Sequence, residues 1–191
     1  MQEQFSRSAG VLMPVSSLPG PYGIGTFGKR AYEFVDNLVK ARQKYWQVLP
    51  LGPTSFGDSP YAFFSAFAGN PYFIDLDMLI EEGLLTKEFV DSKRWNIEDQ
   101  YVDYGLVYNS RFEVLRVAYE NSNHKELNEY KEFFTENEFW LEDYSLYRAC
   151  KDKYEGRPWS EWDKEIKFRE AETVGAFKEE LKDDMDFYKF I

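Results

Sequence analysis

The first fifty residues carry a strand–helix–strand pattern, which restricts the possible folds more than any other feature of the chain. Two short apolar runs, at residues 10–15 and 45–51, are bounded by turn residues, as is typical of strands buried on both faces. Between them, apolar residues recur at helical spacing from Phe27 to about Arg42, with Thr26 placed as the N-cap. Because a helical crossover joins parallel strands, the pattern predicts a βαβ unit in an α/β fold.

The rest of the chain is predicted to be mostly helical. A further short strand is predicted at 73–76, and beyond Gly83 apolar residues are spaced three and four apart at 112–119, 127–134 and 141–147. A last stripe runs from 174 to 191, and no Gly, Asn or Pro closes it. The pattern therefore predicts a chain interrupted in the middle of a helix.

Charge and turn-forming residues divide the chain near residue 80. Residues 1–80 hold six Lys+Arg and six Asp+Glu, so the remaining 17 basic and 28 acidic residues in 81–191 account for the whole net charge of −11. Seven of the eight Pro and eight of the twelve Gly lie in 1–80. The first part is thus predicted to be rich in defined turns, and the second to be charged and helical.

Composition excludes several classes of protein. A net charge of −11 argues against a nucleic-acid partner or an anionic membrane surface, because no basic field is present. Cys150 is the single cysteine, so an internal disulfide and a Cys-rich zinc site are excluded. No apolar run approaches the roughly 20 residues that span a bilayer. We expect a cytoplasmic protein without a membrane segment.

Two loops are candidates for ligand binding because each follows a predicted strand. In parallel α/β folds, ligands meet the loops at the carboxyl ends of the strands. The loops 16–25 and 52–61 combine Gly and Pro with the following aromatic and short polar side chains: Tyr22, Phe56, Asp58, Ser59 and Tyr61. Aromatic faces beside short polar groups suit a sugar, although aromatic residues that merely close the rim of the fold would give the same composition.

The remaining candidate groups favour structural roles. The run 20–25 has neither the GxGxxG order nor a Walker lysine, which argues against a phosphate cradle. His124, the only histidine, lies in a charged stretch and is expected at the surface, without metal partners. Cys150 is expected to pack rather than react. Asp58 either binds a ligand hydroxyl or, as we favour, braces its own turn, and Asp75 and Asp77 are expected to anchor the segment from Met78.

Seven longer motifs occur in an order that resembles the amino-terminal part of a known enzyme family. They are GVLMPVSSLPGPYGIG at 10–25, YWQVLPLGPT at 45–54, GDSPY at 57–61, SAFAGNPYFIDL at 65–76, VDYGLVY at 102–108, WLEDYSLY at 140–147 and PWSEW at 158–162. On these motifs the chain resembles the 4-α-glucanotransferases, also called amylomaltases or disproportionating enzymes, of glycoside hydrolase family 77.

The resemblance implies a (β/α)₈ TIM barrel with inserted helical subdomains. Residues 1–80 then correspond to the first barrel strands and helix with substrate-facing loops, 81–172 to a helical insertion, and 173–191 to the truncated start of a further barrel helix. A barrel takes about 250 residues. It is therefore expected to be incomplete in this chain, which would make self-association possible.

The resemblance also implies an activity, namely transfer of a segment of an α-1,4-glucan to the 4-hydroxyl of an acceptor sugar. The mechanism is a retaining double displacement that needs neither a metal nor an organic cofactor. No position here corresponds to the family's catalytic carboxylates, so this chain alone is expected to be inactive. The alternative is a non-catalytic glucan-binding or scaffold protein.

Individual residues match the family's sugar contacts. Tyr61 matches the aromatic residue that stacks on the sugar at the cleavage point, with Ser59 as a hydrogen-bonding neighbour. Tyr108 matches a tyrosine of a second glucan-binding groove, and its aromatic companion corresponds to Phe56. Together with Asp58, these form the expected substrate-binding set for maltooligosaccharides. Two departures, Ala62 in place of a Gln and Met13 in place of a His, remove polar contacts that relatives have.

Overall fold

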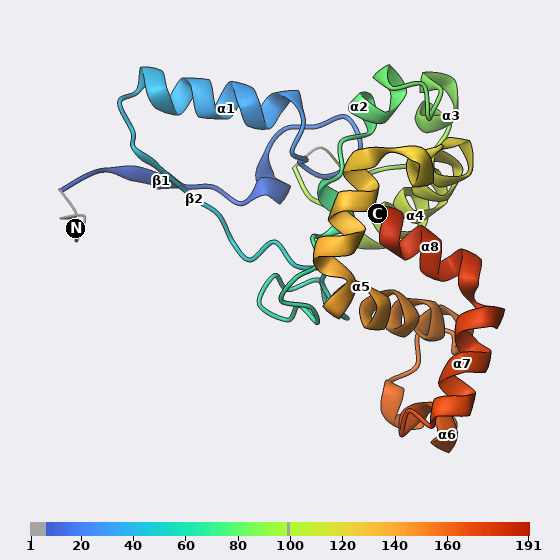
Figure 1. Ribbon diagram of the computed structural model, residues 1–191. Helices are drawn as coiled ribbons and strands as arrows, with labels where there is room; N and C mark the ends of the chain where they lie inside the picture. Colours follow the sequence, from blue (N-terminus) through green and yellow to red (C-terminus); the bar gives the residue numbers. More distant parts are fainter. Residues whose placement is uncertain (1–6, 99) are drawn as a thin grey trace. The chain divides into compact units, whose positions relative to one another are not determined.

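The computed structural model describes residues 7–98 and 100–191, and the chain separates into two compact units. The first unit is Met1–Ala118 and the second is Tyr119–Ile191. Helix α4, Tyr104–Asn121, contains the boundary between them (Figure 1).

The first unit contains the predicted βαβ arrangement. Strand β1 (Gly10–Leu12) pairs in parallel with β2 (Tyr45–Gln47), and helix α1 (Lys29–Lys40) is the crossover between them (Figure 1). Gly10 lies opposite Tyr45, where an added Cβ would come within 2.6 Å of the Tyr45 carbonyl oxygen. The close approach of the two backbones therefore requires glycine at this position.

The strands are shorter and more exposed than the apolar runs predict. Each strand alternates exposed, half-buried and exposed residues, so the expected burial on both faces is wrong for the described residues. Trp46 is the half-buried residue of β2, and it contacts Phe34 of α1 edge-on at 5.0 Å between ring centroids. Pro14 follows β1 and leads into a 3₁₀ turn, Val15–Ser17. Proline lacks the N–H that a continuing ladder needs, which shortens the strand.

Helix α1 begins two residues later than predicted, because Thr26 is not its N-cap. The N-cap is Gly28, and the Thr26 hydroxyl instead donates to Asp75 Oδ2 at 2.5 Å. A Cβ at position 28 would lie 1.8 Å from that same carboxylate oxygen. The Asp75 side chain thus occupies the space beside the helix start and selects glycine there.

The predicted strand at 73–76 is wrong. The segment forms a 3₁₀ turn, Pro71–Phe73, followed by helix α2, Leu76–Glu81. Asn70 Oδ1 accepts a hydrogen bond from the Tyr72 N–H, and Asp75 Oδ1 caps α2 by accepting from the Met78 N–H at 3.1 Å. Side chains that satisfy local N–H groups in this way favour turns and helix starts over a strand.

Asp75 therefore anchors α2 as expected, whereas Asp77 does not take that role. Asp77 Oδ1 accepts the hydroxyl hydrogen bond of buried Tyr22 at 2.6 Å. A short helix α3, Lys87–Asp91, is capped by Thr86 and follows α2 along the chain.

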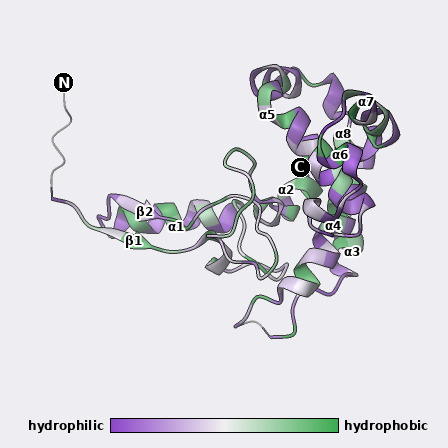
Figure 2. Ribbon diagram, turned by 90° about the horizontal axis from the view of Figure 1, so that it is seen from below, coloured by the Kyte–Doolittle hydropathy of each residue, from purple (hydrophilic) through white to green (hydrophobic). Residues whose placement is uncertain are grey.

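The second unit is helical, as the spacing of apolar residues predicts. It contains α5 (Asn128–Lys153), α6 (Lys164–Lys167), α7 (Ala171–Glu180) and α8 (Lys182–Phe190), with α8 packed along α5. Figure 2 shows hydrophilic and hydrophobic stretches alternating along these helices, as amphipathic packing requires. The stripes at 127–134 and 141–147 belong to the single helix α5, and the stripe at 112–119 lies on α4.

The apolar stripe from 174 to 191 is divided into two helices. Leu181, with φ −101° and ψ 18°, ends α7 and begins α8. Leu181 is buried with Met185 and Ile166 in the core of the second unit. A buried hydrophobic residue thus ends one helix here without a glycine or proline, which is why the sequence pattern does not show the break.

The prediction that His124 lies at the surface is wrong. Its side chain is buried among the rings of Tyr119, Tyr130 and Phe190, at 4.8 to 5.4 Å between centroids. The Ser122 hydroxyl donates to the Tyr119 carbonyl oxygen, so His124 Nδ1, 2.7 Å from the same hydroxyl, must be the donor of that pair. The ring is then the neutral Nδ1–H tautomer, and its buried Nε2 has no partner.

Candidate functional site

The carboxyl ends of the two strands meet at a cavity of about 150 Å³ in the first unit. Its walls come from residues 14–16 after β1, residues 49–60 after β2, the 3₁₀ turn at 70–73 and the start of α4. Both predicted ligand loops therefore contribute to one hollow, as the parallel strand arrangement requires. The lining residues are Pro14, Val15, Ser16, Ile24, Leu49, Pro50, Leu51, Thr54, Asp58, Pro60, Asn70, Tyr72, Phe73 and Tyr104.

Asp58 is the carboxylate of this cavity. Its backbone has φ 51°, directly after Gly57 at φ 88°, so two successive residues adopt left-handed conformations. The Thr54 hydroxyl donates to Asp58 Oδ1 at 3.3 Å. This contact agrees with a bracing role, although the donor is the Thr54 side chain rather than a backbone N–H of the turn.

Burial sets the electrostatics of the cavity. Desolvation raises the pKa of Asp58, while the hydrogen bond from Thr54 opposes the rise. Burial also raises the pKa of Tyr104, and the nearby Asp58 charge adds to that rise. The cavity therefore presents a phenolic donor and a partly desolvated carboxyl acceptor to the same space.

The ends of the loop that carries Ser59 and Tyr61 are joined by backbone pairing, and its middle is exposed to solvent. An antiparallel bridge between Thr54 and Phe63 joins its two ends, and the Tyr61 N–H donates to Ser59 Oγ at 3.4 Å. Tyr61 is 73% exposed and Phe56 is 103% exposed. Both rings thus lie on the surface of the unit with their faces accessible to a ligand.

Helix α4 supplies the remaining predicted residue, Tyr108. Its ring contacts Phe112 at 5.0 Å between centroids and is 47% exposed. Buried Arg111 ties this helix to the loops, because its Nη1 donates to the Ile74 carbonyl oxygen at 2.9 Å and its guanidinium lies 5.3 Å from the Trp95 ring. Burial lowers the pKa of Arg111 to about 10. Arg111 thus fixes the position of Tyr104 and Tyr108 relative to the start of α2.

The structure brings some of the predicted residues together and leaves others apart. Of the five, Asp58 alone lines the cavity, and Ser59, Tyr61, Phe56 and Tyr108 lie outside its walls. Sequence reasoning missed Tyr104 and Asn70 as wall residues. Both lie inside motifs that resemble the family, Asn70 at 65–76 and Tyr104 at 102–108, so the motifs mark them as candidates. Their spacing along the chain does not reveal that the two segments meet at one cavity.

Other classes of site are not evident in the described part of the chain. Residues 7–98 and 100–191 contain no group of three or more His, Cys, Asp or Glu side chains arranged to hold a metal ion. Among the same residues, no helix is both long enough and apolar enough to cross a membrane. Cys150 is buried and the pKa of its thiol is raised by burial to about 11, which confirms a packing role.

The sequence profile of the 4-alpha-glucanotransferase family matches residues 13–191, nearly the whole chain. The chain belongs to the 4-alpha-glucanotransferase family. It is 52% identical over 179 residues to the 4-alpha-glucanotransferase of Clostridium butyricum, covering 94% of this chain and 37% of that relative. It is 41% identical over 191 residues to the enzyme of Thermus thermophilus, again covering 37% of the relative. The chain thus spans a little over a third of the length of these curated relatives.

Solved structures agree with this membership. Amylomaltase from Streptococcus agalactiae, in complex with acarbose, matches with a TM-score of 0.90 and 39% identity over 97% of this chain and 38% of that one. Amylomaltase from Corynebacterium glutamicum matches with a TM-score of 0.67 at 17% identity, which supports the fold alone. The small parallel sheet with its crossover helix is consistent with the partial barrel expected of a 4-alpha-glucanotransferase.

Proposed function

We propose that this chain is the substrate-binding amino-terminal part of a 4-α-glucanotransferase that acts on α-1,4-glucans. The observation that carries the proposal is the family match over residues 13–191, combined with strand-end loops that form a polar and aromatic surface. Exposed Tyr61 and Phe56 offer ring faces, and Asp58 and Tyr104 offer an acceptor and a donor. Flat apolar faces beside hydroxyl partners are what a glucose ring requires.

The proposed reaction is a retaining double displacement. A carboxylate attacks the anomeric carbon and forms a covalent glucosyl ester, while a carboxylic acid protonates the departing 4-oxygen. The 4-hydroxyl of the acceptor then attacks the same carbon, the first bond to the enzyme breaks, and the former acid takes up the acceptor's proton. One glycosidic bond is broken and one is formed, so neither an oxidant nor a metal is needed.

We propose further that the two catalytic carboxylates lie outside residues 1–191. The carboxylates near the cavity are already engaged, because Asp75 caps α2 and accepts from Thr26, and Asp77 accepts from Tyr22. Asp58 accepts from Thr54 and has no second carboxylate among the walls of the cavity. A retaining pair needs two carboxyl groups about 5 Å apart, one of them a nucleophile free to attack.

Binding by the isolated chain tests the role of the loops. Maltoheptaose added to the 191-residue chain is expected to bind weakly, and Tyr61→Ala is expected to lower the affinity at least about tenfold, because it removes a stacking face. Tyr32→Ala is the matched control, since Tyr32 lies on α1 and is similarly exposed at 65%. Equal loss in both variants, or no loss in Tyr61→Ala, would contradict the assigned role.

Activity tests the rest of the proposal. The product of the complete reading frame that contains this sequence should convert maltotriose to glucose and longer maltosaccharides, whereas the 191-residue chain should leave maltotriose unchanged. Disproportionation by the short chain would refute the placement of the carboxylates. A full-length product that binds maltoheptaose without turnover would instead favour the non-catalytic glucan-binding alternative.

A further inference from the structure

The second unit contains a cavity of its own, also about 150 Å³, that the proposed function does not use. Its walls come from α5, from the loop that carries the PWSEW motif, and from the segment that joins α6 to α7. The apolar walls include Tyr147 and Cys150 of α5 together with Trp159 and Trp162 of the loop. Every lining residue lies between 143 and 174, so the cavity belongs to the second unit alone.

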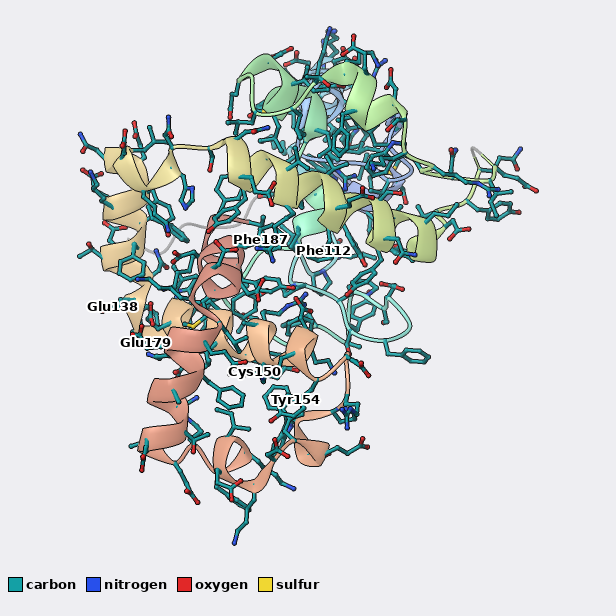
Figure 3. The ribbon with its side chains drawn as sticks, turned by 90° about the vertical axis from the view of Figure 1, so that its right-hand side faces the viewer. Phe112, Glu138, Cys150, Tyr154, Glu179 and Phe187 are labelled. Carbon is teal, nitrogen blue, oxygen red and sulfur yellow. The ribbon has the colours of Figure 1, made fainter. Side chains whose placement is uncertain are left out.

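Ring contacts and hydrogen bonds hold the Trp162 wall of this cavity in place. The Trp162 ring stacks on Tyr154 at 5.3 Å with an interplanar angle of 13°, and also contacts Tyr147 at 5.6 Å. Its indole N–H donates to the Arg157 carbonyl oxygen, and the Tyr154 hydroxyl donates to Asp163 Oδ2 at 2.8 Å. Figure 3 shows Cys150 and Tyr154 near the end of α5, and both belong to the same core cluster as Trp162. These contacts pre-organise the Trp162 wall, which lowers the ordering cost of binding a ring.

One aromatic wall is open to solvent. Trp159 is 56% exposed, although it belongs to the same motif as buried Trp162. Trp159 lines the cavity, and an indole N–H is a hydrogen-bond donor that can serve a ligand there. An exposed indole beside a hollow offers a flat apolar face on which a sugar ring can stack.

The rim of the cavity is polar. Asp143 and Arg169 form an ion pair at 2.7 Å, with side chains 58% and 57% exposed, and the Lys167 ammonium donates to the Ser160 carbonyl oxygen. Arg169 has φ 58°, an uncommon conformation for a residue other than glycine, and this turn places it at the rim. An exposed ion pair contributes little to stability, so its donors and acceptors can exchange to the hydroxyls of a ligand at small cost.

Size and charge restrict the occupant. A hollow of about 150 Å³ holds a single six-membered ring rather than a peptide segment. The rim carries two cationic groups and one carboxylate. Arg169 is paired with Asp143, and the Lys167 ammonium is bonded to a carbonyl oxygen, so little unpaired charge is left. Such a rim suits a neutral ligand rich in hydroxyl groups.

We propose that this cavity is an accessory site that binds one glucosyl residue of an α-glucan, with Trp159 as the stacking face and Asp143 and Arg169 as hydroxyl partners. The identity of the ligand rests on the proposed function, since an enzyme acting on long α-glucans meets chains that extend well beyond the cleavage point. The site itself rests on the second unit alone. It would hold a remote part of the same polymer and raise its effective concentration.

Fluorine NMR of the 191-residue chain labelled with 5-fluorotryptophan tests this proposal. The chain has five tryptophans, and substitution assigns the signal of each. Titration with maltoheptaose should shift the Trp159 and Trp162 signals in a saturable way, both in the unchanged chain and in Tyr61→Ala. Arg169→Ala should lower the affinity for maltoheptaose, measured from the Trp162 signal, about tenfold, as expected for loss of a charged hydrogen-bond donor. Phe139→Ala, an exposed aromatic of α5 outside the cavity, should leave it unchanged.

The outcomes separate the two proposals. Shifts at Trp159 that persist in Tyr61→Ala support the accessory site even if the strand-end loops bind nothing. Binding that depends on Tyr61 while Trp159 and Trp162 stay unmoved overturns the accessory site and leaves the proposed function intact. A response to indole but not to maltoheptaose also overturns it, because the hollow would then accept an apolar ring without recognising hydroxyl groups. No response to either ligand overturns it as well.

Discussion

The two units of this chain reach order by different physical means. In the first unit, short elements are joined by long loops. Asn70 and Asp75 accept from nearby backbone N–H groups, and Asp77 accepts from the distant Tyr22 hydroxyl. In the second unit, four helices bury aromatic rings against each other, and their backbone hydrogen bonds are internal to each helix. Loops held by single contacts place functional groups accurately but depend on each contact, whereas helices held by shared apolar surface tolerate change at most positions.

The difference explains where each candidate site lies. The first cavity is built from backbone turns, so its polar groups are fixed by glycines, prolines and side-chain caps. The second is built from ring faces on and beside α5, so its shape depends on a few large side chains. Four substitutions test this contrast.

Trp162→Ala should have the largest effect, in the helical unit. Trp162 is 9% exposed and contacts two tyrosine rings, so truncation leaves a cavity and costs about 3–5 kcal/mol in the free energy of unfolding. Urea denaturation measures the loss, and hydrogen exchange should locate it in residues 119–191. Exposed Trp159→Ala should cost less than about 1 kcal/mol. Equal costs for the two would mean that the ring cluster does not organise the unit.

Gly25→Ala should have the next largest effect, in the loop-rich unit. A Cβ there would lie 2.1 Å from the Val15 carbonyl oxygen and 2.7 Å from that of Leu18, both of them backbone atoms that cannot move aside. Overpacking of this kind costs about 1–3 kcal/mol. The control, Gly175→Ala in α7, meets nothing within 4 Å and should stabilise its helix by about 0.5–1 kcal/mol. Thermal melting of the two variants should shift in opposite directions, and a shift in the same direction would contradict the comparison.

Asp75→Ala removes a side chain that accepts two different hydrogen bonds. The carboxylate caps α2 and accepts from the Thr26 hydroxyl, so its loss should cost about 1–2 kcal/mol. Thr86→Ala removes only the cap of α3 and should cost about half as much. Chemical denaturation compares them. A cost for Asp75→Ala no greater than that for Thr86→Ala would show that the Thr26 contact contributes nothing.

His124 should make the second unit sensitive to pH. Burial lowers its pKa in the folded state, Lys125 acts in the same direction, and Asp186 opposes them. The unfolded state therefore binds the proton more readily, so stability is complete above the unfolded pKa of about 6.5 and falls as pH drops below it. Urea midpoints measured between about pH 7.5 and 5.5 should show this decline. His124→Gln, which cannot titrate, should show a smaller decline, and an identical slope would exclude His124 as the cause.

Much of the fold and part of the first cavity could be predicted from the sequence. The apolar runs around an amphipathic segment predicted the parallel pair β1 and β2, and spacing predicted the long helix α5. The motifs predicted family membership, and the turn-rich loops predicted which segments line the first cavity. Some errors lie where a distant side chain decides a local structure, as at Thr26, whose hydroxyl donates to Asp75 instead of capping α1. His124 is another, because three rings from other segments of the second unit cover a histidine in a polar stretch.

The parallel strand pair, the long helix α5 and the family are predictable from the sequence alone, because hydrophobic periodicity, turn chemistry and motif order are properties of neighbouring residues. Only the tertiary structure decided which groups share a cavity, that Tyr104 faces the same space as Asp58, and that Trp162 is buried while Trp159 is exposed. Those facts depend on contacts between residues tens of positions apart, such as Thr26 with Asp75 and Arg111 with Ile74. The physical reason is that burial and desolvation, which set the ring contacts and the pKa values, arise only when distant segments exclude water together.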